Sequence, residues 1–155
     1  MQPKTPFRPA AMGMVALTLC ACAPPPHDPD ATTRHVERQG RLRAGLVAGV
    51  APGQAERMRR LAGDIAQAHH ARLDARTGPA GALMRDLEAG RLDLVVGVFP
   101  KRSPWSRRVA FSAPFPKADV AKDTPVVRVA VHPGENRWLM GIERTIAAQS
   151  GGEQG

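Results

Sequence analysis

The residues best suited to bind a solute lie in one short loop, from Phe99 to Arg108. Its cations are Lys101, Arg102, Arg107 and Arg108. Such cations pair with carboxylates or phosphates, and an aromatic ring such as that of Trp105 stacks on flat or cationic groups. We expect contact with a small polar or anionic solute, and the candidate ligand-binding residues are Phe99, Arg102, Ser103, Trp105 and Arg107. Alternatively, the cations are solvated and Trp105 covers an edge of the domain.

Motifs for catalysis or metal binding do not occur in the sequence. It contains no glycine-rich phosphate loop, no Gly-x-Ser-x-Gly turn and no His-Glu-x-x-His string. His69 and His70 are adjacent, so on a helix their side chains diverge and cannot both bind one metal ion. Asp86 and Glu88 belong to the polar face of a helix, whereas Asp93 belongs to a buried strand, an arrangement that argues against paired acid–base catalysis. We expect no enzymatic activity, no cofactor and no metal site.

The N-terminus has the pattern of an export signal. A basic start with Lys4 and Arg8 precedes an apolar segment from Ala10 to Leu19. The following Leu19-Cys20-Ala21-Cys22 resembles the lipobox of bacterial lipoprotein precursors, which implies a lipid on Cys22 and a periplasmic location at a bacterial membrane. Cys20 is disfavoured because the bulky Leu19 precedes it. A secreted protein cut nearby and an uncleaved N-terminal anchor are the alternatives.

Composition fits one globular domain. The chain has 155 residues, of which 43% are apolar and 23% charged, with a formal net charge of +8. No apolar run reaches the roughly 18 residues that a membrane-spanning helix needs, so a multi-span transporter is excluded. The arginines are scattered without the aromatic interleaving of a nucleic-acid-binding surface, and we expect no nucleic-acid partner.

Strand and helix patterns alternate along the chain. Short apolar runs predict strands over residues 42–48, 92–99 and 126–131, and a brief alternating segment predicts one over 71–76. We expect 92–99 to be a central strand because it is almost wholly apolar. Helical spacing predicts helices over 54–70, over a short segment that contains Leu83, Met84 and Leu87, and over 134–148, where Trp138 belongs to the core. We therefore predict an α/β fold: a single three-layer lobe with a mainly parallel sheet and helices on both faces.

Three stretches in order give this pattern a family resemblance. They are Leu42-Arg43-Ala44-Gly45, the helix, turn and strand from Leu83 to Gly97, and Arg108-Val109-Ala110-Phe111-Ser112-Ala113-Pro114-Phe115. Together they resemble the first lobe of the type 2 periplasmic solute-binding proteins, the receptors of ABC uptake systems that include amino-acid binders. The resemblance resumes at residues 129–139. Only residues 116–125 lie between the two parts, too few for the family's second lobe.

The resemblance implies a solute-binding role in a transport system, with one lobe and an open cleft. The expected organisation is a lipoprotein signal peptide over 1–21, a proline-rich tether over 22–40, the lobe over 41–149 and a disordered tail over 150–155. Expected partners are a weakly bound small solute, a transporter permease or another envelope protein, and the membrane through the lipid. A lipid-tethered interaction module and a truncated, non-functional relative are the competing interpretations.

Overall fold

A computed structural model describes residues 28–116 and 124–152 of the chain. The predicted signal peptide and Cys22 lie outside these residues. The elements are α1 (Thr32–Gln39), β1 (Arg41–Val47), α2 (Pro52–Ala68), β2 (Arg72–Gly78), α3 (Ala80–Glu88), β3 (Leu94–Phe99), the short 3-10 helix η1 (Pro104–Arg107), β4 (Ala110–Phe111), β5 (Val126–Val131) and α4 (Asn136–Gly152).

The strands form one five-stranded sheet in the order β2-β1-β3-β5-β4. Strands β1, β2 and β3 are parallel, β5 runs antiparallel to β3, and β4 runs antiparallel to β5. Strand β5 is therefore the single reversed strand of this sheet, and the prediction of a mainly parallel sheet is confirmed. The apolar run that predicted a central strand forms β3, in the middle of the sheet.

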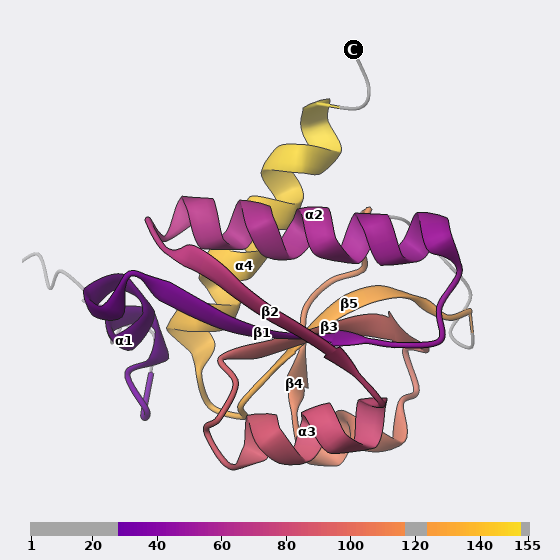
Figure 1. Ribbon diagram of the computed structural model, residues 1–155, viewed down its shortest axis with the longest axis horizontal. Coiled ribbons are helices and arrows are strands. Elements are labelled where there is room, and N and C mark those ends of the chain that lie inside the picture. The colour runs from indigo at the N-terminus through magenta and orange to yellow at the C-terminus, as the bar shows by residue number, and fades with distance from the viewer. Residues whose placement is uncertain (1–27, 117–123, 153–155) are drawn as a thin grey trace, which may run out of the picture.

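Helices cover both faces of this sheet, as predicted. Figure 1 shows α2 and α4 on one side and α3 on the other. Because side chains alternate along a strand, Leu94 and Val96 of β3 pack toward α2, whereas Val95 packs toward α3. Gly97 lies where the sheet is tightest, since a Cβ there would come within 2.7 Å of Val47 Cγ2.

Helix α1 corrects the predicted tether. We expected residues 22–40 to be extended because of their prolines, but residues 32–39 are helical and Val36 is fully buried in the core. The prolines at positions 24–26 and 29 all precede this helix, where they cannot break it. Gly40 ends α1 with a left-handed φ of 59°, a conformation that glycine adopts without strain. The globular fold therefore begins before residue 41.

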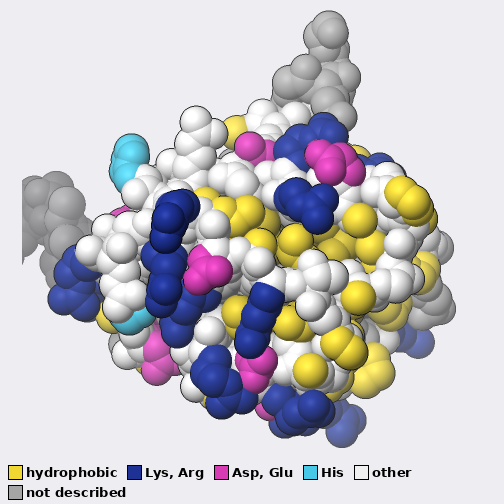
Figure 2. Space-filling view, viewed as in Figure 1, with side chains coloured by type: hydrophobic (Ala, Val, Ile, Leu, Met, Phe, Trp, Pro, Cys, Tyr) yellow, Lys and Arg dark blue, Asp and Glu magenta, His cyan; other side chains and the backbone are white. Residues whose placement is uncertain are grey.

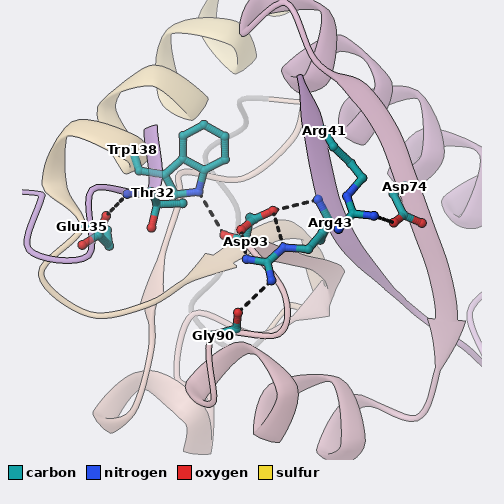
Figure 3. Close-up of polar contacts among 8 residues, drawn as sticks. All are labelled: Thr32, Arg41, Arg43, Asp74, Gly90, Asp93, Glu135 and Trp138. Carbon is teal, nitrogen blue, oxygen red and sulfur yellow. Dashed lines mark hydrogen bonds and ion pairs between the residues drawn. The ribbon is translucent and has the colours of Figure 1, made fainter. Parts of the chain in front are cut away.

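A buried carboxylate ties α1 to the start of α4. The side chain of Glu135 accepts a hydrogen bond from the backbone N–H of Asp30 at 2.6 Å. It accepts a second from the backbone N–H of Thr32 at 3.1 Å (Figure 3). Burial raises the pKa of the Glu135 carboxyl above its usual value, and a hydrogen bond with Asp28 adds to the rise. This cap satisfies N–H groups at the beginning of α1 that have no partner within the helix.

The C-terminal helix is longer than expected. The helix α4 continues to Gly152, so residues 150–152 are helical and do not belong to a disordered tail; residues 153–155 lie outside the described part. Trp138 of this helix is fully buried in the core, as predicted. Among the residues described, no helix is long and apolar enough to span a membrane.

Candidate ligand-binding face

Two loops begin at one edge of the sheet, and one of them is the loop that the sequence analysis selected. Strands β1, β2 and β3 are parallel, so their carboxyl ends share this edge, which we call the carboxyl edge. The loop over residues 48–51 follows β1, and the loop over residues 100–109 follows β3 and contains η1. This second loop leaves the carboxyl edge after Phe99 and runs back to β4, where Phe111 pairs with Ala130, as does Val95 near the start of β3. In open α/β sheets, ligands bind beyond the carboxyl ends of the strands.

The loop after β3 carries cations that no carboxylate neutralises within the described residues. Lys101, Arg102 and Arg107 are exposed, and no ion pair joins them to an acid in residues 28–116 or 124–152. Arg108 differs, because its Nη2 lies 2.5 Å from Glu88 Oε2 and its guanidinium lies 5.7 Å from the ring centroid of Trp105. The three unpaired cations are therefore available to a carboxylate of a solute.

The predicted site residues separate into exposed and structural positions. Arg102 and Arg107 are exposed and Trp105 is half-buried, so all three can meet a solute. Ser103 is buried and caps η1, its Oγ accepting the N–H of Trp105 at 3.3 Å. Phe99 is buried against Phe111, with 5.1 Å between ring centroids. The structure thus gives Ser103 and Phe99 contacts within the lobe.

Arg128, which the sequence analysis did not select, lies beside Phe111. The guanidinium of Arg128 lies 4.8 Å from the ring centroid of Phe111, and its Nε donates to the carbonyl of Ser112 at 2.9 Å. Burial lowers the pKa of Arg128 below its usual value. The available signal was an arginine inside the valine run of β5, facing the same side as Ala130 by the two-residue period of a strand.

The loop after β1 contributes no charge to the carboxyl edge. Ala48, Ala51 and Pro52 are exposed, and Gly49 has a left-handed φ of 79°. Only the first residues of the loop after β3 lie at this edge, because the rest of that loop, with η1 and Arg108, runs back toward β4.

The opposite edge of the sheet holds a structural ion pair. Asp93, just before β3, is buried and accepts hydrogen bonds from Arg43 at its backbone N (2.8 Å), Nε (3.1 Å) and Nη2 (2.5 Å) (Figure 3). The backbone carbonyl of Asp93 accepts the indole N–H of Trp138 at 3.0 Å. The hydrogen bond to Asp93 raises the pKa of Arg43. With its oxygens engaged in this way, Asp93 joins β1, β3 and α4.

Two hollows lie away from the carboxyl edge. A cavity of about 390 Å³ adjoins the Arg43–Asp93 pair and is lined by His35 and His132 among others. A wider groove of about 890 Å³ runs between α1, the end of α2 and α4, beside the exposed Met140. Among the described residues, no group of three or more His, Cys, Asp or Glu side chains could hold a metal ion.

Comparison with solved structures identifies the fold. A single-residue variant of the arginine-bound domain 1 of TmArgBP, from T. maritima, superposes with a TM-score of 0.67 at 20% identity, covering 77% of this chain and 98% of that one. An amino acid ABC transporter substrate-binding protein from Streptococcus pneumoniae, bound to L-arginine, gives 0.66 at 11% identity, covering 79% and 93%. This chain has the fold of one lobe of a type 2 periplasmic binding protein.

A reconstructed protein has the same fold. This ancestral cationic amino acid solute-binding protein gives a TM-score of 0.65 at 12% identity, with 79% of this chain and 95% of that chain covered. In another solved structure, the same ancestral protein is described as a precursor of cyclohexadienyl dehydratase. No protein-family model and no curated protein matches the chain in sequence.

Proposed function

We propose that this lobe is a solute-binding component of an extracytoplasmic transport system and binds an amino-acid-sized carboxylate through the loop after β3. One observation carries the proposal: exposed cations without a described acidic partner stand beside the half-buried ring of Trp105 in the loop after β3. In this proposal Arg102 and Arg107 bind the carboxylate of the solute. The ring of Trp105 covers its remaining part.

A single lobe is enough for the proposed role. Domain 1 of TmArgBP, whose fold this chain shares, has been solved by itself in an arginine-bound form. That precedent supports binding without a second lobe. An open half-site buries less of its ligand than a closed pocket, so we expect a dissociation constant of roughly 1 mM.

The charge of the loop selects among amino acids. Arg102 and Arg107 attract a carboxylate but repel a ligand's guanidinium, and Glu88, the acid that reaches this loop, is already paired with Arg108. We therefore propose that L-glutamate and neutral amino acids bind more tightly than L-arginine. The solved structures with this fold are described as arginine-bound. A comparison of L-glutamate with L-arginine therefore distinguishes this proposal from one in which the chain binds the same ligand as those proteins.

Isothermal titration calorimetry with L-glutamate, L-leucine and L-arginine tests the site. Arg102→Ala and Arg107→Ala are each expected to weaken glutamate binding by about tenfold, because each removes a charge-assisted hydrogen bond. The matched control is Arg60→Ala, which removes an exposed arginine on α2, far along the chain from the loop. No heat with any ligand, or equal losses in all three variants, would end the proposal.

The location of the lobe is the second part of the proposal. We propose that Cys22 carries a lipid that holds the lobe at the outer side of a bacterial membrane, near a permease. Buried methylenes of an acyl chain contribute about 0.8 kcal/mol each, which keeps a multiply acylated cysteine in the bilayer. Support comes from Leu19 and Ala21, which stand where a lipoprotein signal places a leucine and a small residue.

Cell fractionation tests this location. The parent chain is expected in the membrane fraction, with mass spectrometry showing an acylated N-terminal Cys22, whereas Cys22→Ser is expected to lose the acyl group and the membrane association. Cys20→Ser is the matched control and is expected to behave like the parent. An unmodified Cys22 in the membrane-bound parent protein would contradict the lipid anchor.

A further inference from the structure

The outer edge of the sheet at β2 has an unused set of backbone hydrogen-bonding groups. Among the described residues, β2 pairs along its whole length with β1 and with no other strand. Arg72, Asp74, Ala75, Arg76 and Thr77 are all exposed. An exposed edge strand of this length is a template for pairing with another strand.

The hydrogen bonds to neighbouring segments show which groups point outward. The N–H of Arg72 donates to the carbonyl of Gly40, just before β1, and the carbonyl of Gly78 accepts from Ala48, just after β1. These two residues therefore point their backbone groups toward β1. Because alternate residues of a strand point their N–H and C=O groups to opposite sides, Leu73, Ala75 and Thr77 point theirs away from the sheet.

The midpoint of β2 is Ala75, one of the outward-pointing residues. Consider a second copy of β2 that runs antiparallel about a two-fold axis at Ala75. Ala75 then exchanges hydrogen bonds with Ala75 of the second copy, and Leu73 does so with Thr77. This register uses the full strand and satisfies every outward-pointing backbone group of Leu73, Ala75 and Thr77.

The charges of β2 are complementary in the same register. Asp74 lies opposite Arg76 of the second copy, and by symmetry Arg76 lies opposite its Asp74. Side chains at such opposite positions are close enough to interact. Shifting the axis by one residue in either direction puts Asp74 opposite Asp74 or Arg76 opposite Arg76, so like charges disfavour the neighbouring registers.

We propose that two copies of this chain associate through antiparallel pairing of their β2 strands about Ala75. Figure 2, which looks onto the side where β2 lies nearest the viewer, shows basic and acidic side chains interspersed there. Asp74 and Arg76 also contact Arg41 and Asp86 of their own copy, which places charges of both signs along the contact. An isologous contact of this kind closes as a symmetric dimer.

The dimer does not depend on the proposed solute site. The contact uses the side of the sheet at β2, whereas the candidate site lies in the loop after β3 that contains η1. Antiparallel pairing also points the carboxyl edges of the two copies in opposite directions and leaves both open. A protein that binds no solute can still form this dimer, and a monomer can still bind solute.

Sedimentation equilibrium of the full chain, with Cys20→Ser and Cys22→Ser to exclude disulfide-linked dimers, tests the pairing. Because the net charge of +8 favours repulsion between copies, the buffer should contain about 0.3 M salt, which shortens the Debye length to roughly 6 Å. The parent is expected to dimerise with a dissociation constant between about 10 and 100 μM. A monomer at 1 mM would overturn the proposal.

Charge variants make the test specific to this register. D74R and R76D each place like charges opposite one another and are expected to weaken self-association by about tenfold or more. Mixed in equal amounts, the two variants again place Arg opposite Asp at both positions, so the mixture is expected to recover dimers. Self-association of the single variants at the parental level, or no recovery in the mixture, would overturn the register.

R76D removes the ion pair between Arg76 and Asp86 and could therefore fail to fold. A third variant tests the dimer without this change. A75K leaves Asp74 and Arg76 in place and puts two lysines together at the axis. It is expected to weaken self-association by about tenfold while retaining the parental circular dichroism spectrum. Parental association of folded A75K would contradict an axis at Ala75.

Discussion

Trp138→Ala is expected to lower the free energy of unfolding by about 4 kcal/mol. The indole is fully buried in the core cluster between the sheet, α2 and α4, and it packs against His69 with 4.7 Å between ring centroids. Removing it leaves a large cavity and takes away the N–H that the carbonyl of Asp93 accepts. Urea unfolding followed by circular dichroism measures the loss.

Two further variants separate the contributions of Trp138. Trp138→Phe keeps a buried ring but removes the N–H donor, and it is expected to cost about 2 kcal/mol because the Asp93 carbonyl loses its partner. Met140→Ala, two residues away on α4 and 48% exposed, is the control and should change stability by less than about 0.5 kcal/mol. A loss below about 1 kcal/mol for Trp138→Ala would show that α4 does not pack as described.

Asp93→Ala is expected to cost about 3 kcal/mol. The Asp93 side chain is 2% exposed and accepts hydrogen bonds from the backbone and the guanidinium of Arg43, whose side chain is 25% exposed. Removing the carboxylate leaves a guanidinium with little access to water, which is why breaking a buried pair costs more than the pair contributes. The expected loss is at the low end for buried pairs because Arg43 reaches solvent in part.

A matched exposed pair provides the control for Asp93. Asp74 lies 3.7 Å from Arg41, and both side chains are about half exposed, so Asp74→Ala should cost no more than about 0.5 kcal/mol. Unfolding is measured at about 2 μM protein, below the concentration at which the proposed dimer forms. Equal losses for the two aspartates would contradict a structural role for the Arg43–Asp93 pair.

The position of a strand in the sheet could be predicted from the sequence where the whole strand is buried. The run from Leu94 to Phe99 is apolar on both faces, so it could be placed at the centre of the sheet without knowledge of its neighbours. The valine run of β5 was predicted as a strand from its β-branched residues, but its place in the sheet was not predicted. Its antiparallel direction was not predicted, because strand direction depends on the path of the chain between strands rather than on local composition.

The structural role of a residue could not be predicted from the sequence where that role depends on partners far along the chain. Asp93 could be assigned to a buried strand, but its partner Arg43 lies 50 positions away and leaves no local signal. Helix α1 was missed because preceding prolines outweighed its short amphipathic pattern, and Glu135, which caps it, is far along the chain. The roles of Ser103 and Phe99 likewise depend on η1 and on Phe111.

The most direct test of solute binding by the loop after β3 is a titration of the ¹⁵N-labelled chain with L-glutamate, followed by ¹H–¹⁵N correlation spectra. The account predicts shifts in the loops over residues 48–53 and 100–108, with the indole N–H of Trp105 among the largest, and a smaller response to L-arginine. Shifts confined to the cavity beside Arg43, or no shifts up to about 20 mM glutamate, a limit well above the roughly millimolar affinity expected of an open half-site, would contradict it.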